Sequence, residues 1–95
     1  MQVFSESDKV RIREALDRHG AQSRTCQMCG TSGWILADGW VFLSLTESLG
    51  NLRIGGPGLP CIALSCGNCG DTHLFNALIL GLRDLVNRAS GAGVP

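Results

Sequence analysis

The chain has 95 residues, 44% of them apolar and 17% charged, and its eight basic residues balance eight acidic ones. This length predicts a single domain with a small core, and the apolar fraction excludes a disordered chain. A net charge of zero disfavours nucleic-acid and anionic-membrane binding, which depend on excess positive charge. No apolar run approaches the ~20 residues that span a bilayer, and residues 1–10 lack a signal-peptide core, so we expect a cytoplasmic protein with no membrane partner.

The first part of the chain, residues 1–25, predicts a helix followed by a polar linker. Ser5 and Asp8 have the spacing of a capping box, and Gly20 can end a helix, so we expect a helix from Ser5 to His19. Its narrow apolar face consists of Ile12, Ala15, Leu16 and His19. Such a short helix must dock on the rest of the chain. His19 is interpreted as a partly buried helix-end residue rather than a metal ligand.

The segment that follows is typical of β-structure. Trp34–Leu36 and Trp40–Leu43 are rich in aromatic and branched residues. Asp38-Gly39 between them is a turn dipeptide, which predicts that the two strands pair with each other. Glu47–Pro60 is rich in glycine and contains both internal prolines, so we expect a loop or a broken strand pair there. Cys61–Ser65 predicts a short buried strand.

The C-terminal part predicts a last strand, Thr72–Phe75, and a second helix. Asn76 is a suitable N-cap for a helix that runs to about Ala89. The expected core-facing stripe of this helix consists of Leu78, Ile79, Leu82, Leu85, Val86 and Ala89. Leu80 falls on the opposite, polar side, so we predict an exposed residue that contacts a partner or a second copy. Replacing Leu80 by Asp would then leave the fold intact.

Four of the five cysteines form two blocks with the same Cys-x-x-Cys-Gly pattern, Cys26-Gln27-Met28-Cys29-Gly30 and Cys66-Gly67-Asn68-Cys69-Gly70. Paired Cys-x-x-Cys turns supply four thiolates to a tetrahedral metal ion, whereas disulfides are rare in the cytosol. The glycine after each second Cys can adopt a positive φ at little cost. We predict one closed structural metal site with the ligands Cys26, Cys29, Cys66 and Cys69. Four unrelated core or redox thiols are the alternative.

The double knuckle resembles zinc ribbons, in which two such turns hold a small antiparallel sheet in the rubredoxin style. More narrowly, the chain is similar to a group of small bacterial and phage proteins with a leading helix, two CxxCG blocks and a glycine-rich loop between them. The matching positions here are Cys26–Gly30, Trp34, Gly55-Gly56, Pro60, Cys66–Gly70, Phe75-Asn76-Ala77 and Gly81. The resemblance implies a zinc ribbon and no established activity. Rubredoxin itself binds iron, but this chain lacks its proline after each first Cys, which favours zinc over iron.

The expected fold is therefore α+β, a small antiparallel zinc-ribbon sheet with one N-terminal and one C-terminal helix. We expect a single domain over residues 1–95. Its parts are the N-terminal helix and linker (1–25), the ribbon (26–75), the C-terminal helix (76–90) and a tail (91–95).

Several residues outside the four-cysteine set are weaker candidates for function. Cys61 is interpreted as a buried core thiol, with a redox or fifth-ligand role as the alternative. His73 lies four residues after Cys69 and is interpreted as an ordinary strand histidine, although it could replace a cysteine ligand. The glycine-rich loop lacks the Lys-Ser/Thr of a P-loop, so we interpret it as a ribbon tip at which Ile54 is a possible partner contact. Trp34 and Trp40 are interpreted as core anchors rather than base-stacking platforms.

These observations favour a zinc-stapled protein-interaction or structural adaptor module, whose partner is another protein or a second copy. The alternative is a nucleic-acid-binding zinc ribbon of a transcription or translation accessory protein. It is not favoured, because no basic stripe interleaved with aromatic residues is present. The basic residues are Lys9, Arg11, Arg13, Arg18, Arg24, Arg53, Arg83 and Arg88. We expect no enzymatic activity, because the sequence contains no recognisable catalytic arrangement.

Overall fold

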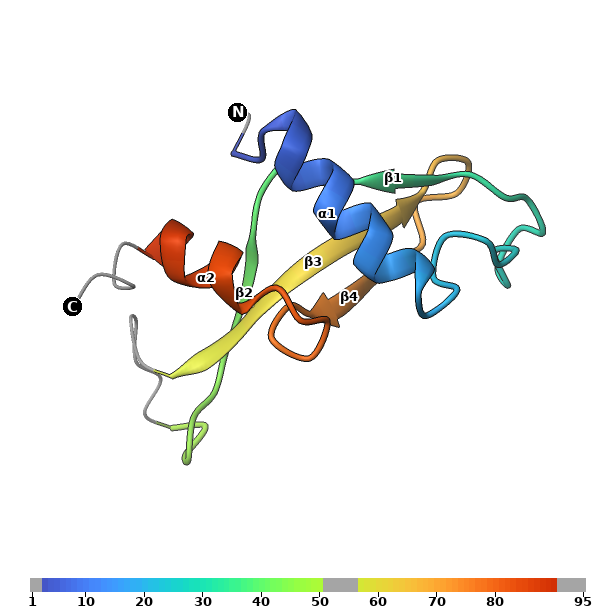
Figure 1. Cartoon of the computed structure of the whole chain (residues 1–95). Coiled ribbons are helices and arrows are strands. Elements are labelled where there is room, and N and C mark those ends of the chain that lie inside the picture. Colours follow the sequence, from blue (N-terminus) through green and yellow to red (C-terminus); the bar gives the residue numbers. More distant parts are fainter. Residues whose placement is uncertain (1–2, 51–56, 91–95) are drawn as a thin grey trace.

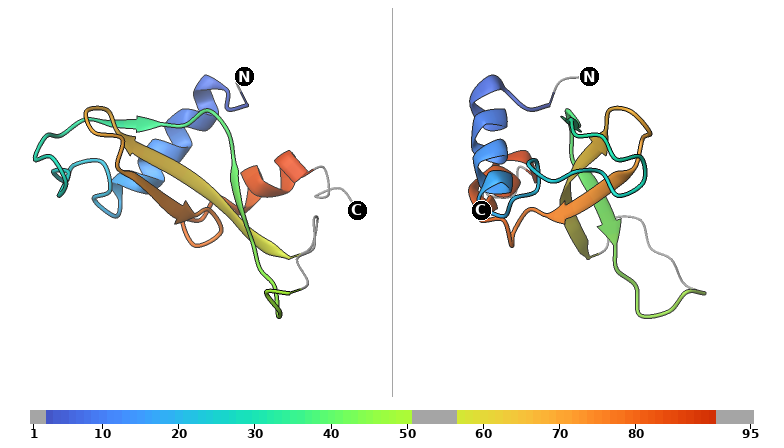
Figure 2. Two further views of the ribbon diagram at one scale, coloured as in Figure 1. Left: turned by 180° about the vertical axis from the view of Figure 1, so that it is seen from behind. Right: turned by 90° about the vertical axis from the view of Figure 1, so that its right-hand side faces the viewer.

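The computed structural model of the chain describes residues 3–50 and 57–90. Two helices accompany one four-stranded antiparallel sheet (Figure 1), which confirms the predicted α+β class. The elements in chain order are α1 (Glu6–Asp17), β1 (Trp34–Leu36), β2 (Val41–Ser44), β3 (Gly58–Cys66), β4 (Thr72–Asn76) and α2 (Arg83–Ser90). Both helices lie on the same side of the sheet (Figure 2). The predicted contact residue Ile54 and the predicted tail lie outside the described residues.

Helix α1 begins and ends as local sequence chemistry predicts. The Ser5 hydroxyl accepts a hydrogen bond from the Asp8 amide at 3.1 Å, and the Asp8 carboxylate accepts one from the Ser5 amide at 3.2 Å. The chain leaves the helix at Gly20, where the following amide donates to the Leu16 carbonyl at 3.1 Å. Helix α1 ends at Asp17, and the last two residues of the predicted helix, Arg18 and His19, lie in the turn that follows. His19 lies in that turn and is exposed, so the prediction that it is partly buried is wrong.

The sheet is built around β3, because β1, β2 and β4 all pair with that strand. The predicted pairing of the two tryptophan-rich strands with each other is wrong. Leu36 of β1 lies opposite Leu64, and Val41 of β2 lies opposite Cys61, so both strands share one edge of β3. The residues between them form a bulge that keeps the chain on this edge. Asp38 in the bulge is held by α1, because its carboxylate lies 2.8 Å from the Lys9 ammonium.

The main core lies between the sheet and the helices. Alternate side chains of β3, among them Ile62 and Leu64, point toward α1 and α2 and are buried. The cluster consists of Phe4, Ile12, Ala15, Leu16, Ala21, Leu36, Ile62, Leu64, Ala77, Leu80, Leu82 and Leu85, with Trp34, Trp40, Phe75 and Val86 packed against it. The interpretation of both tryptophans as core anchors is therefore confirmed. Phe4 meets Trp40 edge-on, with 5.1 Å between ring centroids.

The second helix begins later than predicted, at Arg83 instead of Asn76. Asn76 does start a helical turn, since its side-chain oxygen accepts hydrogen bonds from the amides of Leu78 at 2.9 Å and Ile79 at 3.3 Å. Gly81, at φ 87°, ends that turn, and the next amide donates to the Ala77 carbonyl at 3.0 Å. A left-handed glycine is a helix stop, so the chain leaves the turn before α2 starts.

This interruption reverses the orientations predicted for two residues. Leu80 is only 7% exposed and belongs to the core cluster, whereas Ile79 is 80% exposed. The sequence prediction places Leu80 on the outside by assuming one continuous helix from Asn76. The helix is interrupted at Gly81, so residues before and after that glycine do not share one helical wheel. Leu80 is therefore buried and not a surface contact, so Leu80→Asp is now expected to disturb the fold.

Candidate metal centre

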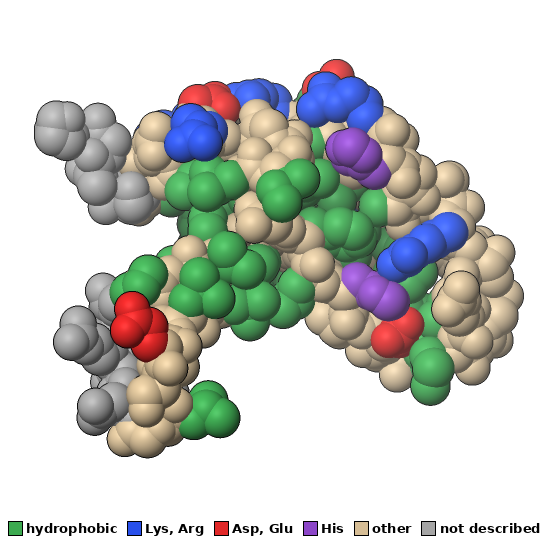
Figure 3. Space-filling model, turned by 90° about the horizontal axis from the view of Figure 1, so that it is seen from below, with side chains coloured by type: hydrophobic (Ala, Val, Ile, Leu, Met, Phe, Trp, Pro, Cys, Tyr) green, Lys and Arg blue, Asp and Glu red, His purple; other side chains and the backbone are tan. Residues whose placement is uncertain are grey.

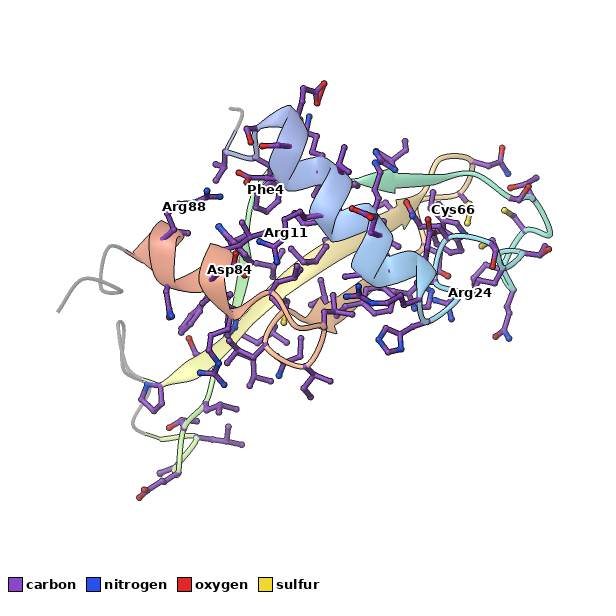
Figure 4. The ribbon with its side chains drawn as sticks, in the orientation of Figure 1. Phe4, Arg11, Arg24, Cys66, Asp84 and Arg88 are labelled. Atoms are coloured by element: carbon purple, nitrogen blue, oxygen red, sulfur yellow. The ribbon has the colours of Figure 1, made fainter. Side chains whose placement is uncertain are left out.

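The four predicted ligands come together at one end of the sheet, in the region around Cys66 (Figure 4). Cys26 and Cys29 lie in the loop after α1, Cys66 ends β3, and Cys69 lies between β3 and β4. Their sulfur atoms all lie within 4.8 Å of one another. The closest are Cys26 Sγ to Cys69 Sγ at 3.7 Å and Cys29 Sγ to Cys66 Sγ at 3.6 Å. A tetrahedron with metal–sulfur bonds of about 2.3 Å places its sulfurs about 3.8 Å apart. The cluster is thus suited to one metal ion.

The two knuckles have the same backbone geometry. In each, the amide of the first Cys donates to the carbonyl five residues later at 2.8 Å, and its carbonyl accepts from the glycine amide at 2.9 or 3.0 Å. Gly30 and Gly70 have φ of 80° and 85°, as predicted from their place after the second Cys. These hydrogen bonds turn each loop so that the two pairs of sulfurs point into one shared space.

Burial differs among the four ligands. Cys26 and Cys66 are buried, Cys29 is intermediate and Cys69 is exposed. The centre therefore lies at the surface with one side toward solvent. Four thiolates would nevertheless complete a tetrahedron around one ion, and such a site would have no coordination position for water or substrate.

The thiols differ in how readily they lose a proton. Hydrogen bonds from the Thr31 hydroxyl and from Asn68 lower the pKa of Cys29 to about 5. Backbone amides, that of Cys69 first, lower the pKa of Cys66. At Cys69 the Asp71 amide favours the thiolate, but partial desolvation by the surrounding atoms and the neighbouring sulfurs outweigh it and raise the pKa to about 12. Four sulfur ligands at this spacing are the donor set that a thiophilic divalent metal prefers, and such an ion would favour the thiolate form of all four.

A polar and aromatic group packs around the cluster. The Asp71 carboxylate lies 3.8 Å from Cys26 Sγ and 2.8 Å from His73 Nε2. The His73 ring meets Trp34 edge-on at 5.6 Å, and the Trp34 indole N–H donates to the Arg24 carbonyl at 2.9 Å. His73 contacts Asp71 and is not part of the four-ligand group found among residues 3–50 and 57–90. The histidine therefore orients a neighbour of the site.

Two residues beside the sulfurs, Thr31 and Asp71, do not emerge from the sequence analysis. Thr31 Oγ1 lies 3.1 Å from Cys29 Sγ and 3.8 Å from Cys66 Sγ. Both residues stand five positions after the first Cys of their knuckle, and both supply the carbonyl that closes it. That shared position is the signal by which they could have been found.

Cys61 is separate from this centre. It is buried, it donates a hydrogen bond to the Leu59 carbonyl at 3.6 Å, and burial raises its pKa. This environment matches the interpretation of Cys61 as a core thiol, because a buried neutral thiol is a poor nucleophile and a poor ligand.

No protein-family profile, curated protein or solved structure matches this chain. Within the described part of the chain, no helix is long and apolar enough to cross a membrane.

Proposed function

We propose that the chain is a zinc-stapled interaction module. In this proposal Cys26, Cys29, Cys66 and Cys69 hold one Zn²⁺ ion. The ion fixes the two knuckles to the end of the sheet, and the sheet and its loops contact another protein. The proposal rests chiefly on one observation, the convergence of four sulfur atoms within 4.8 Å of one another.

Zinc is the best candidate for the ion because its usual structural sites use four thiolates in a tetrahedron. The ion would have a structural role, since a four-thiolate site has no open position for catalysis. Apparent binding free energies of about 10–16 kcal/mol for such sites are comparable to the whole stability of a small domain. In a chain of 95 residues, the metal would therefore be a principal source of folding energy.

The exposed apolar side chains support a role in protein contact. Within the described residues, large exposed hydrophobic side chains are Val3, Val10, Met28, Ile35, Phe42, Leu43, Leu45, Leu49, Leu74 and Ile79. Figure 3 shows hydrophobic side chains gathered in the middle of one side of the molecule, with most charged side chains around its margin. Contiguous apolar surface with a polar rim is typical of sites that bind proteins.

The charge distribution gives less support to the nucleic-acid alternative. Lys9 is paired with Asp38, Arg88 with Asp8, and Arg11 with Asp84, so these cations are already neutralised within the chain. Four thiolates with one divalent ion would add two net negative charges. A gel shift with generic DNA and RNA at increasing salt tests this alternative, and strong binding that falls with salt would favour it over the interaction module.

The metal site itself is tested by the metal content of the purified protein. We expect one zinc per chain, a colourless protein, and thiolate-to-metal charge-transfer bands after substitution with Co²⁺. Replacing Cys66 by Ser should lower the metal content and remove these bands. Replacing Cys61 by Ser is the matched control, because Cys61 is equally buried but lies outside the cluster. Full zinc content in Cys66→Ser, or a metal-free wild-type protein after purification under reducing conditions, would contradict the proposal.

A further inference from the structure

Thr31 and Asp71 occupy matching positions in the two knuckles. Each stands five residues after the first Cys of its knuckle, and each backbone carbonyl accepts a hydrogen bond from the amide of that Cys at 2.8 Å. The two backbones therefore do the same thing, but the two side chains differ in their chemistry. A threonine hydroxyl can donate a hydrogen bond, whereas a carboxylate can only accept one. The two knuckles thus present opposite groups to the sulfurs.

The Thr31 hydroxyl lies beside one pair of sulfurs that comes from both knuckles. Its oxygen is 3.1 Å from Cys29 Sγ and 3.8 Å from Cys66 Sγ, and these two sulfurs are 3.6 Å apart. A cysteine that binds a metal does so as a thiolate, which accepts hydrogen bonds and donates none. With the metal bound, the hydroxyl donates to this pair and disperses part of its negative charge. Thr31 therefore stabilises the metal-loaded form.

The Asp71 carboxylate lies beside a different sulfur, at 3.8 Å from Cys26 Sγ, and in that contact the Cys26 thiol is the donor. A metal-bound Cys26 has no proton to donate, so the same contact then joins two negative charges. His73 keeps the carboxylate there, because His73 Nε2 lies 2.8 Å from the Asp71 oxygen that faces the sulfur. The Asp71 side chain is only 27% exposed, so solvent screens the repulsion in part. Asp71 therefore destabilises the metal-loaded form.

We propose that Thr31 and Asp71 set the metal affinity of the centre in opposite directions, with Thr31 raising it and Asp71 lowering it. The inference rests on the proposed function, because it concerns the Zn²⁺ ion named there. Neither side chain belongs to the four-ligand group, and each acts through the sulfur that it contacts. The carboxylate keeps the affinity below the maximum that four thiolates allow, so the chain gives up its ion more readily to a competing chelator.

The test is competition for Zn²⁺ between the full chain and a chromophoric chelator, at neutral pH under reducing conditions. Thr31→Val removes the donor and keeps the shape, so it should raise the dissociation constant about 10-fold, the lower end for neighbours of metal ligands. Thr31→Ser restores the hydroxyl and should return the dissociation constant to that of the wild type. Asp71→Asn removes the charge and adds an amide donor, so it should lower the dissociation constant about 10-fold.

Thr25→Val and Asp17→Asn are the matched controls. Thr25 is exposed and stands directly before the first Cys, and Asp17 is exposed, with its carboxylate accepting a hydrogen bond from Gln22 at 2.8 Å. In the described part of the chain, neither side chain forms a hydrogen bond with a sulfur. Both controls should bind zinc as the wild type does, which separates a local effect on the sulfurs from a change in net charge.

Co²⁺ substitution separates an effect on the sulfurs from an effect on folding. A thiolate that loses a hydrogen bond holds its electrons less tightly, so Thr31→Val should shift the thiolate-to-metal charge-transfer bands to lower energy. Asp71→Asn should shift them to higher energy, because a neighbouring negative charge is removed. Asp71→Thr, which copies the first knuckle, should shift the bands in the same direction as Asp71→Asn, so misfolding of one variant does not decide the result.

The outcomes distinguish this inference from the proposed function. A zinc-binding wild type whose affinity is unchanged in both Thr31→Val and Asp71→Asn would overturn the inference alone. Weaker zinc binding by folded Asp71→Asn and Asp71→Thr, checked by far-UV circular dichroism of the loaded proteins, would also overturn it. A wild type that binds no zinc would instead contradict the proposed function.

Discussion

At one end of the sheet, α1 and α2 bury apolar side chains such as Ile12 and Leu82 against β3. At the other end, residues 26–33 and 66–71 form the two knuckles, and Cys26 and Cys66 are their buried members. We call these the helix end and the metal end. The helix end obtains its stability from the removal of apolar surface from water, whereas the metal end has almost none to remove. Its loops are shaped by backbone hydrogen bonds, and a bound cation would hold the four sulfurs together as thiolates.

The largest effect should come from removing the metal. Chelation at neutral pH is expected to remove about 10–16 kcal/mol of apparent stabilisation, the range for structural zinc sites. Amide hydrogen exchange should show the knuckles losing protection first, with the central strand β3 following because Cys66 is its last residue. Survival of knuckle protection and of the near-UV signal after complete metal removal would show that both ends are held by packing alone.

The next effect tests the helix end through two adjacent residues. Leu80→Asp should destabilise the protein by about 3–5 kcal/mol, because it places a carboxylate in the apolar core. Ile79→Asp should change the stability by less than about 0.5 kcal/mol, because Ile79 is in solvent. Urea unfolding of the two variants, both saturated with zinc, measures the difference. Equal stabilities would mean that the turn after β4 is not arranged as described.

A smaller effect is expected at the glycine that separates this turn from α2. Gly81→Ala should cost about 1–2 kcal/mol, since a side chain at φ 87° is strained although no atom lies in its way. Gly50→Ala is the control, because Gly50 lacks a positive φ and an added Cβ would make only an ordinary contact. Thermal unfolding of both variants measures the cost, and a neutral Gly81→Ala would contradict the helix stop.

The smallest effect concerns the ion pairs that join the two helices. Hydrogen bonding to Arg11 lowers the pKa of Asp84, and hydrogen bonding to Arg88 lowers the pKa of Asp8. A lowered folded-state pKa means that the pair stabilises the fold above the usual carboxyl pKa near 4, and that this contribution fades as the pH falls through the lower folded-state value. Asp84→Asn should therefore be slightly less stable than wild type at pH 7 and equal to it at about pH 2. Paired unfolding curves at both pH values check the sign, and a larger gap in acid would contradict it.

Local chemistry explains which features could be predicted. The capping box of α1, its stop at Gly20 and the two glycine-closed knuckles each depend on residues within five positions of one another. The four sulfurs also came together as predicted, because a double Cys-x-x-Cys pattern leaves few other arrangements. The continuous helix predicted from Asn76 is wrong. The apolar spacing continues on both sides of Gly81, and this spacing gives no sign that a single residue between them has a positive φ.

The sequence by itself determined the fold class, the four clustered cysteines and the start of α1, since short-range hydrogen bonding and ligand spacing are written in adjacent residues. Only the tertiary structure decided that β1 and β2 share one edge of β3 and that Leu80 is buried. Each of these depends on contacts between segments distant in the chain. A turn dipeptide or a helical wheel carries no information about which strand or which helix will be on the other side.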